Sequence, residues 1–475
     1  MPNAIVWFRN DLRLADNPAF QAALDAGLTP IPVYIHAPEE EGAWAPGAAA
    51  EAWRHHSLAA LDASLKRRGS RLRIFHSPSL QTLQSLAAAC DASAVFWNRR
   101  YEPAIEKRDT RIKSTLRDQG LHAESFNGAL LIEPWKLATK QGGPYRVFTP
   151  FWRTARAALR LPTLFEPPGS LPSTDEGPHG LPLDALGLLS KLGWDAGFWE
   201  HWQPGEGGAR QALEAFVDGA LHAYARGRDL PDQIGTSRLS PHLHFGEIAP
   251  WRIATVLLSL RQPKLEGEVD GYIRQLYWRE FAHHLLHHFP HTPEQNLNPR
   301  FADFDWARVD ERMRDAWRHG RTGVPIVDAG MRELWHTGWM HNRVRMIVGS
   351  YLCKHMRYHW REGARWFWDT LVDADLANNT LGWQWIAGTG ADAAPYFRVF
   401  NPVTQAEKFD PDGRYISRWL PELDALPLPQ RFSPWTDPSL LARRAPDYPR
   451  RPIVDLAAGR EAALVAYRKT GAGED

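Results

Sequence analysis

The stretch AIVWFRNDLRLADNPAFQAALDAGLTPIPVYIH, residues 4–36, joins two short apolar runs through a segment of helical pattern. AIVWF and IPVYIH are short runs of apolar or β-branched residues, which is typical of strands. Between them, NPAFQAALDAG has a helical pattern. A strand, a helix and a second strand in this order predict two parallel neighbours in one sheet.

The same alternation continues for about a hundred residues. Three more strand-like runs follow, RLRIFH, AVFWN and HAESFNG, separated by the helical patterns AEAWRHHSLAALDASLKRRG, SLQTLQSLAAACD and AIEKRDTRIKSTLRDQG. The first 130 residues therefore predict an α/β fold with a doubly wound, five-stranded parallel sheet. No G-x-G-x-x-G follows the first strand, so the dinucleotide fingerprint is absent. A ligand could still bind at the carboxyl edge of the strands, as in other such sheets.

The rest of the chain has a different pattern. A passage rich in Pro and Gly, which includes LPTLFEPPGSLPSTDEGPHGLP, is typical of a linker or an extended surface loop. After it, strand-like runs give way to segments of helical period, such as PWRIATVLLSLRQ and NRVRMIVGSYL. We therefore predict an α/β domain over residues 1–130, a linker over 131–208 and an all-α domain over 209–475.

The composition limits the class of protein. A length of 475 residues favours two domains, and 44% hydrophobic with 23% charged residues is typical of a globular protein. No apolar run approaches a membrane span, and the N-terminus lacks the pattern of a signal peptide. Only two cysteines, Cys90 and Cys353, are present, which gives no disulfide framework and suits a reducing cytoplasm.

The net charge and the aromatic content bear on what kind of molecule the protein binds. The formal net charge is +1, so a nucleic-acid surface would have to be a local basic patch. The 22 tryptophans suggest stacking, flat ligands or electron transfer, although packing must explain most of them.

Five histidines crowd the stretch YIRQLYWREFAHHLLHHFPH, residues 272–291. His283 and His287 lie at i, i+4, a spacing that can hold a metal, and so do His284 and His288. No cysteine and no third ligand at a suggestive spacing accompany them. The pattern therefore favours a packed helix whose inward face carries Ile273, Leu276, Tyr277, Phe281 and Leu285.

Three further segments have both a chemical and a structural interpretation. GTSRLS, residues 235–240, offers hydroxyls and backbone N–H groups before a helix, as a phosphate cradle or as simple capping. Asn342 and Met346 share one helix face between arginines, where they could meet a base or a flat ring, or could simply pack. Asp373 and Asp375 could cap a helix or pair with Arg345.

These segments occur in one order: GTSRLSPHLHFGEI, LYWREF, GWMHNRVRMI, DADLANN, GWQW and APYFRVFNP, after the opening IVWFRNDLRLADNPA. With them, the chain resembles the photolyase/cryptochrome flavoprotein family along nearly its whole length, and is most similar to bacterial cyclobutane pyrimidine dimer (CPD) photolyases. The resemblance implies an α/β antenna-type domain followed by a helical domain that binds FAD and DNA. It also implies light-driven repair, and we expect a cytoplasmic, nucleoid-associated monomer without membrane association.

The resemblance implies FAD contacts residue by residue. Tyr224 and the run Thr236, Ser237, Arg238, Leu239 and Ser240 would lie at the phosphates, and Tyr272 stands where the family often has Trp. Asp373 and Asp375 would lie near the ribityl chain and ring, with Arg345 as the partner of an aspartate. The amide of Asn379 would accept from flavin N5, and Arg345 would stabilise anionic charge on the ring.

The resemblance also implies that a lesion is flipped out of the duplex, as photolyases do, into a cavity above the flavin. Trp278 and Trp385 would pack on the dimer, and Asn342 and Met346 would contact it. The arginines expected at the lesion or nearby phosphates are Arg228, Arg279 and Arg343. Binding should then weaken as salt rises.

The implied reaction is electron transfer from excited, reduced FAD to the dimer, followed by ring splitting and electron return. Trp383, Trp360 and Trp306 match, in this order, the indoles that re-reduce oxidised flavin from the protein surface. Each of these tryptophans, taken singly, is equally well explained as a core residue.

The chain departs from the CPD photolyases at Gln275, where they typically carry a lesion-contacting Glu. Gln can hydrogen-bond a thymine edge but can be neither an anion nor a protonated acid. The (6-4) photolyases commonly carry Gln here, but they have histidines where this chain has Asn342 and Met346. We expect retained CPD binding with less efficient splitting.

Two alternatives remain at this point: a cryptochrome-type blue-light photoreceptor with weak or no repair, and a nucleotide-binding protein without photochemistry. The family usually carries an antenna, methenyltetrahydrofolate or a deazaflavin, in its N-terminal domain. NRRYEPAIEKRD, residues 98–109, lacks the Asn-Glu pair of some folate-binding members. The sequence therefore leaves the antenna open.

Overall fold

The computed structural model describes residues 2–392 and 397–470. The chain divides into two compact units. The first unit comprises residues 1–219, 237–290 and 372–376, and the second comprises 220–236, 291–371 and 377–475. The boundaries predicted after residues 130 and 208 are positions along the sequence and stay predictions. Each unit is described below by itself.

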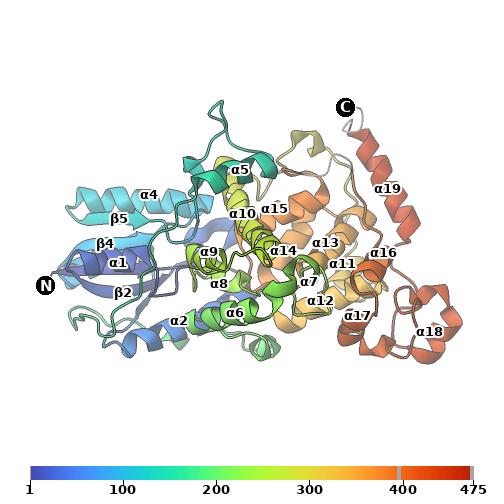
Figure 1. The fold of residues 1–475 in the computed structure, drawn as a ribbon, viewed down its shortest axis with the longest axis horizontal. Coiled ribbons are helices and arrows are strands. Elements are labelled where there is room, and N and C mark those ends of the chain that lie inside the picture. The colour runs from blue at the N-terminus through green and yellow to red at the C-terminus, as the bar shows by residue number, and fades with distance from the viewer. Residues whose placement is uncertain (1, 393–396, 471–475) are drawn as a thin grey trace. The chain divides into compact units, whose positions relative to one another are not determined.

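The first unit contains the predicted parallel sheet, drawn at the blue end of the chain in Figure 1. Its five strands run in the order β3-β2-β1-β4-β5, and every neighbouring pair is parallel. Strand order therefore reverses around β1, which is the doubly wound arrangement. The strands are β1 (Asn3–Phe8), β2 (Thr29–His36), β3 (Arg73–His76), β4 (Ala92–Asn98) and β5 (His122–Phe126). The helices between them are α1 (Pro18–Asp25), α2 (Ala48–Lys66), α3 (Ser79–Ala89) and α4 (Pro103–Asp118).

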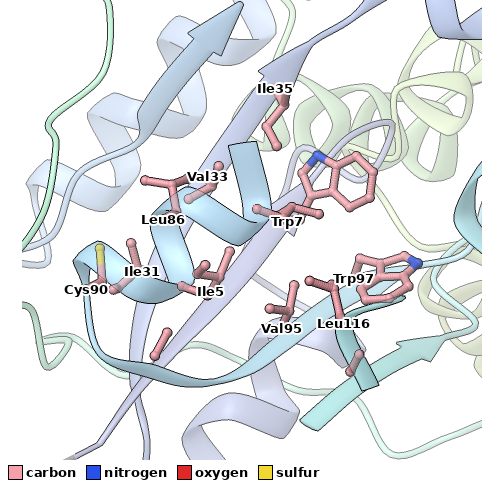
Figure 2. Packing of buried hydrophobic residues seen from close by; sticks show 14 of the residues in the cluster. Ile5, Trp7, Ile31, Val33, Ile35, Leu86, Cys90, Val95, Trp97 and Leu116 are labelled. Atoms are coloured by element: carbon pink, nitrogen blue, oxygen red, sulfur yellow. The ribbon is translucent and has the colours of Figure 1, made fainter. Parts of the chain in front are cut away.

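The core of this sheet explains why its strands read as continuous apolar runs. Every residue of β1 and β2 is buried. Trp7 and Trp97 lie side by side with ring centroids 6.0 Å apart, and Leu86 of α3 and Leu116 of α4 belong to the same cluster (Figure 2). Burying each such side chain contributes roughly 1.5–3 kcal/mol. The sheet is therefore held on both faces, as parallel sheets usually are.

A segment of the Pro/Gly-rich passage covers the edge of the sheet at β3. Leu181 N donates to Ile74 O at 2.7 Å, and Arg73 donates to the carbonyl of Thr174 at 2.7 Å. Gly180 has a φ of +85°, and a Cβ there would lie 2.4 Å from Ile74 O, so only glycine fits this close approach. The passage therefore pairs with an edge strand that would otherwise expose unpaired backbone groups.

The helices of the first unit that follow the sheet carry several predicted site residues. They are α5 (Phe148–Ala158), α6 (Glu206–Asp218), α8 (Ser240–His244), α9 (Pro250–Ser259) and α10 (Glu266–His288). α10 packs against α5 and α9. The predicted inward face of α10 is confirmed, because all five of its apolar residues are buried. His283 and His284 are buried as well, and His287 and His288 are half-buried.

The second unit is helical throughout its described secondary structure, as predicted. Its α-helices are α7 (Tyr224–Gly227), α11 (Glu311–Arg318), α12 (Pro325–Thr337), α13 (Asn342–Ser350), α14 (Trp360–Thr370), α15 (Leu376–Ala387), α16 (Pro402–Phe409), α17 (Arg414–Trp419), α18 (Pro438–Arg444) and α19 (Leu456–Lys469). A π-helical turn, Tyr351–His355, follows α13 directly. Within the described ranges, no helix combines the length and the apolar character that crossing a membrane requires.

Candidate functional site

In the first unit, α10 carries four of the predicted site residues. Tyr272 is buried, and its hydroxyl lies 2.8 Å from Ser237 Oγ. Gln275 is half-buried, and its amide nitrogen donates to Gly271 O of the preceding helical turn at 3.2 Å. Arg279 donates from Nη1 to Ala129 O at 2.7 Å. The helix thus brings Tyr272 together with Ser237.

Trp278, also on α10, has a partner that the sequence did not reveal. Its ring stacks on Phe148 of α5, with centroids 3.6 Å apart and planes inclined by only 6°. Phe281 meets the same indole edge-on at 5.9 Å. Such packing fixes the plane of the indole, as a stacking surface for a flat ligand requires.

The run 237–240 takes a defined turn before α8. Leu239 N donates to Ser237 Oγ at 3.3 Å, and Arg238 has a φ of +52°. The Arg238 guanidinium carbon lies 5.7 Å from the Trp202 ring centroid, and Ser240 begins α8. The Ser237 hydroxyl therefore makes two contacts, one with Leu239 N inside the turn and one with the Tyr272 hydroxyl.

Asp375 faces two histidines of the first unit. Its Oδ2 lies 3.5 Å from His283 Nε2 and 3.9 Å from His244 Nδ1. Burial opposes ionisation of Asp375, but His283 and His244 outweigh it and hold the pKa of the carboxyl well below its usual range. Asp373 lies two residues earlier and is half-buried. The predicted pairing of an aspartate with Arg345 stays a prediction.

In the second unit, a buried network fixes the start of α13. Glu333 Oε2 accepts from His341 N at 3.1 Å and from the Tyr415 hydroxyl at 2.7 Å. His341 Nδ1 in turn accepts from Arg343 N at 3.2 Å, which caps the helix. Burial lowers the pKa of His341 to about 4, so its ring is neutral at pH 7 and Nδ1 can accept.

α13 is a helix over the predicted stretch, so Asn342 and Met346 lie four residues apart on one face. Arg343 bonds Asp229 at 2.8 Å, and its guanidinium carbon lies 4.3 Å from the Phe409 ring centroid. Arg345 donates from Nε to Met340 O at 2.7 Å. The arginines beside Asn342 and Met346 are thus held by specific partners and do not form a loose, solvated face.

The segment with Tyr224, Arg228 and Thr236 is folded back on itself within the second unit. Tyr224 is buried, which raises the pKa of its hydroxyl to about 12, and the Arg228 guanidinium carbon lies 5.4 Å from its ring centroid. A Cβ on Gly235 would lie 2.1 Å from Gly227 O, so the backbone leaves no room for a side chain there.

This close approach gives a testable consequence. Gly235→Ala should lower the free energy of unfolding by about 1–3 kcal/mol, because a backbone carbonyl must shift to admit the methyl group. Flavin content per protein after purification should fall with it. Gly227→Ala is the matched control, since its Cβ would meet Gly235 Cα at an ordinary 3.5 Å. Equal urea midpoints for the two variants would contradict the prediction that the close approach of residue 235 to Gly227 O excludes a side chain.

Asn379 presents its amide in one orientation. Its Nδ2 donates to Ala364 O at 3.0 Å, and a carbonyl can only accept, so the nitrogen must point there. Oδ1 is then the end of the amide that is directed elsewhere. An acceptor oxygen held this way suits the predicted contact with a protonated flavin nitrogen.

The three tryptophans of the predicted electron path all lie within the second unit. A Cβ on Gly363 would lie 2.0 Å from Trp383 Cη2, and Gly363 is one helical turn from Trp360 on α14. The His359 ring lies 5.5 Å from the Trp360 ring and 5.0 Å from the Trp306 ring. Trp383 and Trp360 are buried, whereas Trp306 is half-buried.

The other indoles of this region are also placed. Trp385 is half-buried, and its Nε1 donates to Asp392 O at 3.1 Å. It lies two positions from Trp383 on α15, so the two indoles face different sides of the helix. Trp317, which was not among the predicted residues, meets Trp383 edge-on at 6.5 Å. No spacing rule could have found it, because 66 residues separate the two.

The first unit has a small cavity at the carboxyl edge of its sheet. Its volume is about 20 Å³, and its lining includes Trp7, His36, Arg9, Arg54, Arg100, Arg108 and Glu41. One water needs roughly 10–15 Å³, so the space inside this arrangement of side chains is small. Arg100 forms ion pairs at the cavity with Glu41 at 2.9 Å and Glu102 at 2.7 Å.

Comparisons with known proteins agree with these features. Residues 4–170 match the family model described as DNA photolyase, and residues 272–469 match the model described as FAD binding domain of DNA photolyase. The second match covers the part of the chain that holds Asn379 and the predicted tryptophan path. The helical part therefore contains an FAD-binding domain.

Relatives extend over nearly the whole chain. A deoxyribodipyrimidine photo-lyase of Agrobacterium fabrum is 47% identical over 98% of this chain and 97% of its own length. Cryptochrome-1 of Arabidopsis thaliana is 39% identical over 95% of this chain and 68% of its own length. The crystal structure of a class III photolyase from Agrobacterium tumefaciens matches with a TM-score of 0.95 and 46% identity, over 99% of this chain and 98% of that one. The chain belongs to the photolyase/cryptochrome family of flavoproteins.

Proposed function

We propose that this protein repairs cyclobutane pyrimidine dimers in DNA with light, using reduced FAD. The observation that carries the proposal is the 47% identity to a deoxyribodipyrimidine photo-lyase over 97% of that protein's length. The alternative from the same family is a cryptochrome-type function, and Cryptochrome-1 of Arabidopsis thaliana, at 39% identity, is covered over 68% of its length. We further propose a monomer that acts on DNA in the cytoplasm, associated with the nucleoid.

FAD is the cofactor of the proposal, and when bound and reduced it supplies a light-excited electron. The proposed contacts in the first unit are Ser237, Arg238, Leu239, Ser240, Tyr272, Asp373 and Asp375. Those in the second unit are Tyr224, Thr236, Arg345 and Asn379. Asn379 Oδ1 would accept a hydrogen bond from a protonated ring nitrogen, because Nδ2 already donates to Ala364 O. Arg345 favours negative charge on the ring by Coulomb attraction.

The proposed DNA contacts combine flat rings, an amide, a thioether and positive charges. Trp278, held by Phe148, and Trp385 offer flat faces to a flipped-out dimer. Asn342 offers an amide, Met346 a polarisable thioether, and Arg228, Arg279 and Arg343 offer positive charge. Each phosphate that an arginine neutralises makes binding fall as salt rises.

We assign the re-reduction of oxidised FAD to Trp383, Trp360 and Trp306. Trp360 donates its indole N–H to Asn296 Oδ1 at 2.8 Å, which fixes the orientation of the ring. Trp306 is half-buried, whereas the other two are buried, so it is the proposed entry point for electrons from solvent.

Gln275 supplies a test of the repair chemistry. Gln275→Glu should raise the number of dimers split per absorbed photon, because a carboxyl group can share a proton with the lesion and an amide cannot. The expected gain is several-fold, equivalent to about 1 kcal/mol of added stabilisation. The measurement is the repair yield at limiting light, with the binding constant for the same oligonucleotide as control. No gain in yield at unchanged binding would contradict the proposed role of this position.

A photoreceptor with weak repair is the second candidate, and the observation that favours it is Gln275 itself. The two candidates separate in one experiment: reduced protein is illuminated with an oligonucleotide that contains one dimer. Repair predicts dimer loss in light and none in darkness. Photochemistry of the flavin without dimer loss would favour the photoreceptor.

An antenna, methenyltetrahydrofolate or a deazaflavin, is part of the proposal, and its identity stays open. The absorption spectrum of the purified protein after removal of FAD would identify a second chromophore, because the two candidates absorb differently.

A further inference from the structure

His283 is held on α10 by a bond that fixes one of its protons. Its Nδ1 lies 3.0 Å from Arg279 O, one helical turn earlier. A carbonyl oxygen can only accept, so Nδ1 must carry hydrogen and donate. His283 is buried, with only 6% of its surface exposed.

The other ring nitrogen faces a carboxylate. His283 Nε2 lies 3.5 Å from Asp375 Oδ2. In the neutral tautomer that donates from Nδ1, Nε2 would turn a lone pair toward this negative oxygen. Only the imidazolium form donates on both sides, so the two contacts together require His283 to be positively charged.

The surroundings of His283 agree with a charged ring. Burial by itself lowers the pKa of His283, but Asp375 outweighs burial and the net pKa is raised. His244 of α8 approaches the same Asp375 oxygen at 3.9 Å. Arg279, on the same helix, opposes the charge, and Glu280 faces it with a carboxyl whose pKa burial raises. Tyr101 meets the ring edge-on at 6.1 Å and stays neutral, because burial raises the pKa of its hydroxyl well above the usual range.

We infer that the His283 imidazolium positions the Asp375 carboxylate and balances its charge at the proposed FAD site, so that protonation of His283 sets how readily the bound cofactor is reduced. This inference rests on the proposed function of Asp375 as an FAD contact. His283 is a positioning residue, because it acts on FAD only through Asp375. His244 supports the same carboxylate from the other helix.

The pH dependence has a definite sign. Because the pKa of His283 is raised in the folded protein, the ion pair contributes its full stability below the ordinary histidine pKa, about 6.5. That contribution is lost as pH rises through the raised, folded-state pKa. The reduction of bound FAD should become less favourable over the same interval, since Asp375 then keeps an unbalanced negative charge.

Three variants of the FAD-loaded protein separate the effects. His283→Gln removes the charge, and His283→Arg keeps a cation that does not titrate. His284→Gln is the matched control: its ring is buried on the same helix, accepts from Tyr145 N at 3.0 Å, and has a pKa lowered to about 4 by burial, so it is neutral. A glutamine there retains an oxygen that can accept from Tyr145.

Two readouts are measured on each protein. Histidine-selective NMR should show His283 titrating above pH 6.5, and Asp375→Asn should move that titration downward. Redox titration of bound FAD against pH should then show a break in the wild type and in His284→Gln. His283→Gln should lose the break and hold on the order of threefold less reduced FAD at a fixed potential, as one partly screened charge predicts. His283→Arg should lose the break but keep the reduced fraction.

Two results would overturn the inference. A His283 pKa at or below the ordinary histidine value would contradict the ion pair with Asp375. A redox profile that His283→Gln leaves unchanged would contradict the coupling to FAD. Failure of the proposed function looks different: wild-type protein that binds FAD and shows these titrations, but splits no dimers in light, would contradict repair and leave the ion pair standing.

Discussion

Replacement of Trp383 by Phe is expected to abolish photoreduction of FAD by external thiol under blue light. Trp383 is the first indole of the proposed path, and Phe cannot supply an electron in its place. The buried indole packs on Phe367 with ring centroids 4.9 Å apart, and Phe preserves most of this apolar contact. Loss of stability should stay within about 1–3 kcal/mol. The measurement is the decay of oxidised-flavin absorbance in continuous light.

The matched control for this variant is Trp366→Phe. Trp366 lies on the same helix as Trp360 but stacks on Trp335, with centroids 6.0 Å apart, outside the proposed path. It should photoreduce at the wild-type rate. Trp383→Phe reduced chemically beforehand should still split dimers, because only refilling depends on the path. Photoreduction of Trp383→Phe at the wild-type rate would contradict the assignment of Trp383.

Gly363→Ala is expected to have the largest effect on stability, lowering the free energy of unfolding by about 1–3 kcal/mol or more. The new Cβ would lie 2.0 Å from Trp383 Cη2 and 2.5 Å from two further ring atoms. The indole cannot move aside freely, because Trp317 and Phe367 pack against it. A displaced Trp383 should slow photoreduction as well. Urea unfolding, followed by flavin fluorescence, measures the loss.

Gly382→Ala is the control for this prediction. Gly382 neighbours Trp383 on α15, and a Cβ there would meet nothing within 4 Å. Alanine in a helix interior is favoured over glycine by roughly 1 kcal/mol, so this variant should be as stable as the wild type or more so. A Gly363→Ala protein as stable as Gly382→Ala would contradict the close packing of α14 on Trp383.

The sheet was predictable because its strands are buried on both faces. Such strands read as unbroken apolar runs, and their alternation with helices fixes the parallel arrangement. The inward face of α10 was predictable for a similar reason, since Ile273, Leu276 and Phe281 follow a helical period. Both predictions use only residues that are neighbours in sequence.

The partners of the site residues were not predictable, because they come from distant parts of the chain. Phe148 stacks on Trp278 across 130 residues, Asp229 bonds Arg343 across 114, and His283 faces Asp375 across 92. No local pattern encodes such pairs. The resemblance to photolyases indicated which residues to propose for the site, but not which side chains orient them. The packed arginines around the sheet-edge cavity likewise became evident only in three dimensions.

The most direct test of the account is light-driven splitting of a dimer. Protein loaded with reduced FAD is mixed with an oligonucleotide carrying a single CPD, and intact dimer is counted by chromatography after illumination or darkness. An identical oligonucleotide with a (6-4) lesion controls for selectivity, because Asn342 and Met346 stand where (6-4) enzymes carry histidines. The account predicts loss of the CPD in light only, with the (6-4) lesion unchanged. A CPD that remains intact in light, in protein shown to bind both FAD and the oligonucleotide, would contradict it.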